Sequence, residues 1–203
     1  IVTARKREES LQEVPISIRV LDADFLATSR ILDVQNALIR VPGIGFGQPF
    51  KSYTPIAIRG ASTQDDSIGV DPNVAIFIDG VNVGSTTSIE FDLLDLARVE
   101  VLKGPQGTTF GRNTNGGIIH YVTRRPDSEF RAGMNLTLGN YDRIELGGYL
   151  NGAIADNVAG SLSMRTRNSG GYFKNLSTGS MLGQDKVSTT RGKLLFSPND
   201  KLD

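Results

Sequence analysis

The chain has 203 residues with 22 basic and 22 acidic side chains, so its formal net charge is zero. This balance argues against a nucleic-acid-binding protein, because such binding depends on an excess of positive charge. There is no cysteine and one histidine, His120. These counts exclude disulfides, zinc–thiolate sites, a cysteine nucleophile and a site made of several histidines. We expect no cofactor and no bound metal.

The first part of the chain, to about Pro126, mixes helix and strand signals. The segment 14–27 is predicted to begin extended after a proline and to continue as a helix capped by Asp22 or Asp24. A second short helix is expected over 33–43, ending at a Pro-Gly pair. Another is expected over 88–97. Four short strands are predicted: PIAIRG (55–60), VAIFIDG (74–80), ARVEVLKG (97–104) and GIIHYVT (117–123). The VAIFI strand is apolar on both faces, so we place it centrally in the sheet of an α+β domain.

Residues 104–117, GPQGTTFGRNTNGG, form a glycine-rich stretch between two of these strands. A phosphate-binding P-loop requires a Lys-Ser or Lys-Thr pair that is missing here. A dinucleotide-binding fingerprint opens a helix, whereas this stretch opens the strand 117–123. His120 lies in that strand, in phase with apolar residues, and is predicted to be structural. Since no catalytic triad or carboxylate pair is evident, the chain is not predicted to be an enzyme.

After Pro126 the pattern changes to strict alternation of apolar and polar residues. Four segments of about 10 residues show it: FRAGMNLTL (130–138), RIELGGYLNGAI (143–154), VAGSLSMRT (158–166) and TTRGKLLF (189–196). Such strands fit a transmembrane β-barrel, and they also fit a soluble antiparallel sheet with one wet face. The short 155–157 turn is expected on the periplasmic side, and the 139–142 turn and long 168–186 loop outside the cell. Phe130 and Phe196 would then face lipid at the periplasmic rim.

Several segments carry a family resemblance. LARVEVLKGPQGTTFGRNTNGGIIHYVTRRP (96–126) resembles the end of the plug domain of TonB-dependent outer-membrane receptors. VPGI (41–44), IAIRG (56–60) and VAIFIDGV (74–81) match the family in the same order upstream. The opening IVTARKREESLQEVPISI resembles the TonB-box region, and residues from 139 onward resemble the first barrel strands. The resemblance covers essentially the whole chain.

The resemblance implies an α+β plug domain followed by the first four antiparallel strands of an incomplete transmembrane β-barrel. The expected boundaries are 1–15 for the TonB-box and linker region, 16–128 for the plug and 129–203 for the barrel part. Family barrels close with 22 strands, so the chain is expected to be a fragment of a longer protein.

The implied function is TonB-dependent active uptake of a large, scarce nutrient, such as an iron–siderophore complex, across the outer membrane of a Gram-negative bacterium. The plug occludes the barrel. The implied partners are the periplasmic TonB protein, outer-membrane lipid and an extracellular small-molecule or metal-chelate substrate. A soluble binding or signalling module that reuses the plug fold is the main alternative. A hydrolase or nucleotide enzyme is the third.

The resemblance also assigns candidate sites. The TonB-binding strand, which would pair by β-strand addition, is Ile1, Val2, Thr3 and Ala4. The expected plug–barrel contacts are Arg59, Lys103, Gly104, Gly107, Gly111, Arg112, Gly116 and Gly117. Glycine suits this place because it allows close backbone approach, and the lysine replaces a more usual arginine, which weakens bidentate pairing. The expected substrate contacts, on loops facing outward, are Gln48, Phe50, Tyr53, Gln64 and Asn82.

Overall fold

In the computed structural model of the chain, the described residues are 9, 15–28, 34–47, 55–63, 65, 67, 70–84 and 95–197. The chain forms two compact units, residues 1–123 and 124–203, and each is described by itself. The change of unit follows Thr123, a few residues before the boundary expected at 128. No helix within the described ranges is long and apolar enough to cross a membrane.

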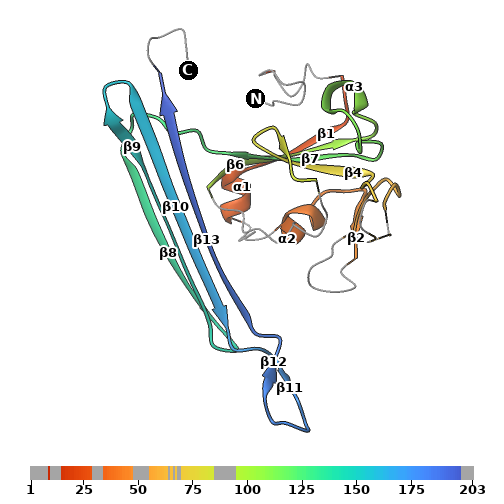
Figure 1. The fold of residues 1–203 in the computed structure, drawn as a ribbon, viewed down its shortest axis with the longest axis vertical. Coiled ribbons are helices and arrows are strands. Elements are labelled where there is room, and N and C mark those ends of the chain that lie inside the picture. Colours follow the sequence, from red (N-terminus) through yellow and green to blue (C-terminus); the bar gives the residue numbers. More distant parts are fainter. Residues whose placement is uncertain are drawn as a thin grey trace. The chain divides into compact units, whose positions relative to one another are not determined.

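Unit 1 is built on a five-stranded sheet of order β1-β6-β7-β4-β5 (Figure 1). Its strands are β1 (Ile18–Asp22), β4 (Val74–Ile78), β5 (Val81–Asn82), β6 (Leu96–Lys103) and β7 (Gly117–Thr123). β7 pairs antiparallel with β6 and parallel with β4, so β4 and β7 end at the same edge of the sheet. β4 is an interior strand as its apolar pattern predicted, although β7 occupies the middle.

The other elements of unit 1 surround this sheet. Helix α1 (Ala23–Thr28) begins at the predicted cap, where the Phe25 N–H donates to Asp22 Oδ1 at 2.8 Å. Helix α2 (Val34–Ile39) is also as predicted. β2 (Ile44–Phe46) and β3 (Ile56–Ile58) form a separate antiparallel pair, and α3 (Gly107–Phe110) is a single helical turn that was not predicted.

The helix predicted over 88–97 does not agree with the structure at its C-terminal end. Leu96 and Ala97 already belong to β6, and residues 88–94 lie outside the described part of the chain. The β-branched and apolar residues that follow favour the strand ladder with β7, which overrides the local helical pattern.

Two apolar clusters cover the two faces of the unit 1 sheet. The larger contains α1 and α2 residues such as Leu26 and Leu38 together with inward-facing sheet residues such as Val99 and Ile119. The smaller contains Ala75, Phe77, Leu102 and Ile118, with Ile16, Ile18, Val20 and Phe110 packed against it. The buried polar residues Glu100 and His120 occupy neighbouring positions on β6 and β7.

Unit 2 is a four-stranded antiparallel sheet of order β13-β10-β9-β8. Its strands are β8 (Arg131–Gly139), β9 (Arg143–Ala155), β10 (Val158–Ser169) and β13 (Asp185–Phe196). The four predicted strands are therefore present, and β10 and β13 extend further into the long connection than expected. That connection carries a small unpredicted hairpin, β11 (Phe173–Lys174) and β12 (Met181–Leu182), beyond one end of the sheet (Figure 1).

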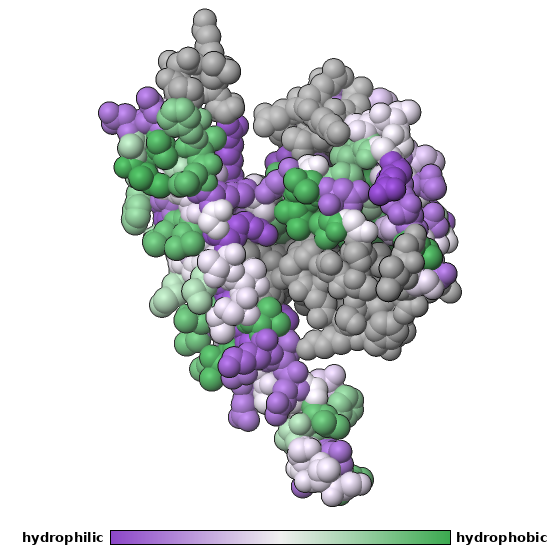
Figure 2. Space-filling model, viewed as in Figure 1, coloured by the Kyte–Doolittle hydropathy of each residue, from purple (hydrophilic) through white to green (hydrophobic). Residues whose placement is uncertain are grey.

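The alternation along these strands separates an apolar face from a polar one. Met134 and Leu194 are 82% and 77% exposed, and Leu146 and Leu162 about half exposed. Figure 2 shows hydrophobic side chains along the length of this sheet. The apolar residues are thus exposed rather than gathered in a water-soluble core, and an apolar surface of this extent marks an interaction surface.

Candidate functional site

Arg59 and Lys103, two of the three predicted basic contacts, both hold the residue that precedes β1. Arg59 follows β3, and its Nη2 donates to Ser17 Oγ at 3.0 Å. Its own backbone N–H donates to Gly43 O at 2.8 Å. Lys103 ends β6, where its Nζ donates to Pro42 O at 2.6 Å and its backbone N–H to Ser17 O at 2.8 Å. The two cations therefore have partners inside unit 1.

The end of the glycine-rich stretch lies against the strands of unit 1. Gly117 has a φ of +142°, and a Cβ there would lie 2.2 Å from Leu102 O. A Cβ on Gly116 would lie 3.1 Å from Ala61 Cβ. The Gly104 N–H donates to Gly116 O at 3.0 Å and closes the loop. Packing within unit 1 accounts for both Gly116 and Gly117.

The middle of the stretch is a compact turn held by its own hydrogen bonds. Gly107 begins α3, and Gly111 ends it with its N–H donating to Gly107 O at 3.0 Å. Thr114 Oγ1 donates to Gly111 O at 2.8 Å. Arg112 is exposed at this turn. Contact between any of these residues and barrel strands stays a prediction.

Most of the candidate TonB and substrate residues lie outside the described part of the chain: Ile1, Val2, Thr3, Ala4, Gln48, Phe50, Tyr53 and Gln64. Asn82 is described and exposed at the end of β5, where its Oδ1 accepts the Gly84 N–H at 2.7 Å. The pairing of β5 with β4 places Asn82 opposite Phe77. Phe77 in turn pairs with His120 of β7, so Asn82 is level with His120 in the sheet.

The polar face of the unit 2 sheet contains ion pairs that the alternation alone did not predict. Glu145 is fully buried and accepts hydrogen bonds from Arg165 at 2.6 Å and from Arg143 Nε at 2.5 Å. Arg167 Nε donates to Asp185 Oδ2 at 2.7 Å. Two of these pairs, Glu145–Arg165 and Arg167–Asp185, join neighbouring strands.

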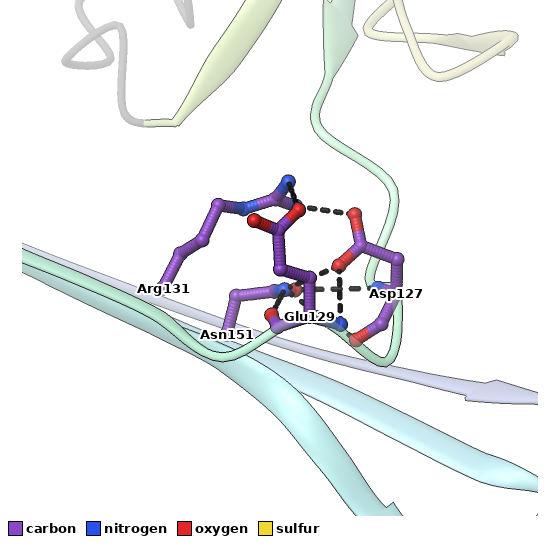
Figure 3. Close-up of polar contacts among 4 residues, drawn as sticks. All are labelled: Asp127, Glu129, Arg131 and Asn151. Carbon is purple, nitrogen blue, oxygen red and sulfur yellow. Dashed lines mark hydrogen bonds and ion pairs between the residues drawn. The ribbon is translucent and has the colours of Figure 1, made fainter.

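A second polar cluster, which we call the junction cluster, lies where the chain enters β8 (Figure 3). It consists of Asp127, Glu129, Arg131 and Asn151, whose side chains converge in the figure. Arg131 forms an ion pair with Asp127. Asn151 Nδ2 donates to Asp127 Oδ1 at 2.9 Å and to Glu129 O at 2.8 Å. These contacts attach the entering segment to β9.

The junction cluster changes the acidity of Asp127. Desolvation raises the pKa of this carboxyl, but hydrogen bonds from Arg131, Asn151 and the Glu129 N–H lower it by more. The charge of Arg131 adds to the lowering, so the pKa lies below its usual range. Sequence reasoning missed this cluster because Asn151 is distant in sequence from the other members.

Exposed aromatic residues gather at the end of the unit 2 sheet that carries the β11–β12 hairpin. Tyr141 and Tyr172 have ring centroids 6.2 Å apart, and Tyr172 and Phe173 4.4 Å apart. Tyr141 and Asp142, in the turn between β8 and β9, have φ values of 62° and 55°. A tyrosine in this left-handed region is uncommon and strained, and such strain is a pointer to function.

No group of three or more His, Asp or Glu side chains within the described ranges is arranged to hold a metal ion. Asp65, in a segment rich in aspartates, accepts hydrogen bonds from the N–H and Oγ of Ser67 at 2.9 and 2.5 Å. These bonds from Ser67 lower the pKa of Asp65 below its usual range. The carboxylate therefore stabilises its own turn.

Comparison with known proteins gives a consistent result. The family model described as TonB-dependent Receptor Plug Domain matches residues 10–118. The chain is 31% identical to the pesticin receptor of Yersinia pestis, over 99% of this chain and 30% of that protein. It is 35% identical to the pesticin receptor of Yersinia enterocolitica, over 98% of this chain and 30% of that protein.

Among solved structures, the ferric yersiniabactin uptake receptor FyuA from Yersinia pestis is similar with a TM-score of 0.87. The identity is 30%, over 98% of this chain and 32% of that chain. The similarity thus extends over the sequences of both units. The chain spans about 30% of the length of the curated relatives it matches.

Proposed function

Since the chain belongs to the TonB-dependent receptor plug domain family, we propose that it is part of an outer-membrane receptor that takes up a large, scarce nutrient in a Gram-negative bacterium. Unit 1 is the plug, and unit 2 supplies the first four strands of the transmembrane barrel. The receptor is not an enzyme: its energy comes through the TonB protein, and its substrate leaves unchanged.

The observation that carries the proposal is the exposed apolar face of unit 2. Ala132, Leu150 and Leu162 are cross-strand partners, and all three are exposed. The opposite face carries the paired charges around Glu145. Apolar-out and polar-in is the pattern of a barrel strand in a membrane. Within the described residues, β8 and β13 each pair on one side only, and an open edge in lipid requires further strands.

We further propose how TonB acts on unit 1. Ile1–Ala4 would pair with TonB as an added strand. Tension would then reach Ser17, which Arg59 and Lys103 hold by hydrogen bonds. Beyond Ser17 the chain enters β1, which within the described part of the chain is an edge strand whose neighbour is β6. An edge strand with one neighbour has the fewest ladder bonds to lose, so β1 is the first element that a pull would detach.

A metal chelate of the siderophore class is the substrate we propose. It is supported by the similar receptor that takes up ferric yersiniabactin. Gln48, Phe50, Tyr53, Gln64 and Asn82 remain our proposed substrate contacts. Asn82 has the weakest support, because its side chain already stabilises its own turn.

The test is uptake of a radiolabelled ferric siderophore by cells that express the full-length protein, with and without TonB. Uptake should require TonB and should be lost when residues 1–4 are deleted. In a parallel test of membrane insertion, Leu162→Arg on the apolar face should reduce outer-membrane assembly, since such a charge costs about 2–4 kcal/mol in mid-membrane. Ser161→Arg, one residue away on the polar face, is the matched control. Recovery of the protein without detergent would favour the soluble module instead.

A further inference from the structure

His120 is the one histidine of the chain, and the proposed uptake mechanism does not use it. It is 6% exposed and lies on β7, between β6 and β4. Its Nε2 accepts a hydrogen bond from the Gly80 N–H at 3.1 Å. Its Nδ1 lies 3.4 Å from Glu100 Oε2, and Glu100 Oε1 accepts from Arg98 Nε at 2.6 Å. We call these four residues the His120 network.

The network determines which nitrogen of the ring carries the proton. A backbone N–H can only donate, so the Nε2 that faces Gly80 is unprotonated. The ring proton of the neutral form is therefore on Nδ1, which lies 3.4 Å from Glu100 Oε2 without a hydrogen bond to it. A histidine in this state can take a second proton only on Nε2, the atom that accepts the hydrogen bond from the Gly80 N–H.

We propose that His120 is a proton-sensitive positioning residue that holds the turn between β4 and β5 when neutral and releases it when protonated. The turn consists of Asp79 and Gly80, with φ values of 48° and 83°, as in a two-residue type I′ hairpin turn. A protonated Nε2 would present its N–H to the Gly80 N–H. Two donors facing each other repel, so the turn must move away from the ring.

The groups around His120 determine how far the turn can move. Glu100 on β6 faces Nδ1, with Arg98 behind it, and Asp79 is the charged residue on the turn itself. Phe77 of β4 and Phe110 of α3 contact the ring edgewise, each with centroids 6.5 Å away. Glu100 keeps its contact with Nδ1 in both states. Proton uptake therefore acts on the Gly80 contact rather than on the whole network.

Asp79 limits the opening to a local one. Its carboxylate accepts the Thr123 N–H at 2.8 Å and the Thr123 Oγ1–H at 2.6 Å. Its N–H donates to Tyr121 O at 2.9 Å. These contacts stay intact when Gly80 is released. Beyond Gly80 the chain continues into β5, where Val81 is 70% exposed, so β5 and the exposed Asn82 are the parts that gain freedom.

The first experiment is hydrogen exchange of the 74–84 segment in the full-length protein at pH 8 and pH 5, corrected for the intrinsic pH dependence of exchange. The protection of the turn amides in the wild type should fall by about 3- to 10-fold at the lower pH, the effect of one net hydrogen bond. His120→Gln places an acceptor oxygen near the position of Nε2, and its amide does not titrate. Its protection should therefore stay constant. Equal pH dependence in the two proteins would overturn the proposal.

His120→Leu removes the acceptor and should show the low protection at both pH values. A second measurement needs no variant: the ring nitrogens of His120 in histidine-labelled protein should show an unprotonated Nε2 at pH 8. A proton on Nε2 at that pH would overturn the proposal. Both readouts are independent of substrate uptake, so they can fail while the proposed transport function stands.

Discussion

Gly117 offers the sharpest test of how the glycine-rich stretch is used. A Cβ on this residue would lie 2.2 Å from Leu102 O and 3.0 Å from Ile58 Cδ1. The side chain of Ile58 can turn aside, but Leu102 O belongs to the backbone of β6, which pairs with β7 along its length. The φ of +142° adds conformational strain for any residue with a side chain.

The two costs add in Gly117→Ala. Forcing the backbone conformation costs about 1–3 kcal/mol, and overfilling the contact costs about 1–3 kcal/mol more. We expect the free energy of opening of the β6–β7 ladder to fall by about 2–6 kcal/mol. Gly107→Ala is the matched control, because nothing lies within 4 Å of a Cβ there. Its effect should stay within about 0.5 kcal/mol.

The assay is hydrogen exchange of the β6 and β7 amides in the full-length protein, which measures opening of the plug separately from the barrel. Equal protection in Gly117→Ala and Gly107→Ala would refute the reasoning. It would mean that β7 can shift away from β6 at no cost and that the glycine serves some contact outside unit 1.

Three further outcomes are expected. Arg59→Ala removes the hydrogen bond to Ser17 and should lower the free energy of opening of the chain before β1 by about 0.5–1 kcal/mol. The measurement is faster proteolysis of that segment, and Arg59→Lys is the control that retains the charge. Because the pKa of Asp127 is lowered, its carboxylate stabilises the junction cluster above about pH 4, and this stabilisation is lost as the pH falls through that pKa. In the wild type, acid should therefore speed hydrogen exchange of the Asn151 side-chain amide. Asp127→Asn should show the same faster exchange already at pH 7. Tyr141→Gly relieves a φ of 62° and should leave the free energy of unfolding unchanged or higher by up to about 1 kcal/mol. Unchanged uptake in that variant would show that transport does not need the Tyr141 side chain.

Period-two alternation explains why unit 2 could be predicted from sequence. Every second side chain of a strand points to the same face, so Met134 and Leu162 could be assigned to the exposed apolar side without knowledge of their neighbours. The strand register was not needed for that assignment. It is needed for cross-strand ion pairs, which is why the Glu145–Arg165 pair was missed.

Unit 1 was predicted less completely because its polar contacts join distant parts of the chain. Gly80 and His120 are brought together by the parallel pairing of β4 and β7, and no local pattern shows that two strands 40 residues apart are neighbours. The β4–β5 and β4–β7 registers place Asn82 opposite Phe77 and level with His120, and its outward position stays a prediction.

The sheet order of unit 1 also indicates which strand a pull on the N-terminus would detach first. Among the described residues, β1 has a single neighbour in the sheet, whereas β7 is paired with β6 on one side and β4 on the other. β7 also carries His120 and Thr123, which hold the β4–β5 turn, and it leads directly into unit 2. A pull applied to the N-terminus would have to break one ladder to free β1 but two to free β7. We therefore expect the amides of β1 to lose protection before those of β7 when TonB engages the receptor in membranes, and simultaneous loss in both strands would contradict the proposed order.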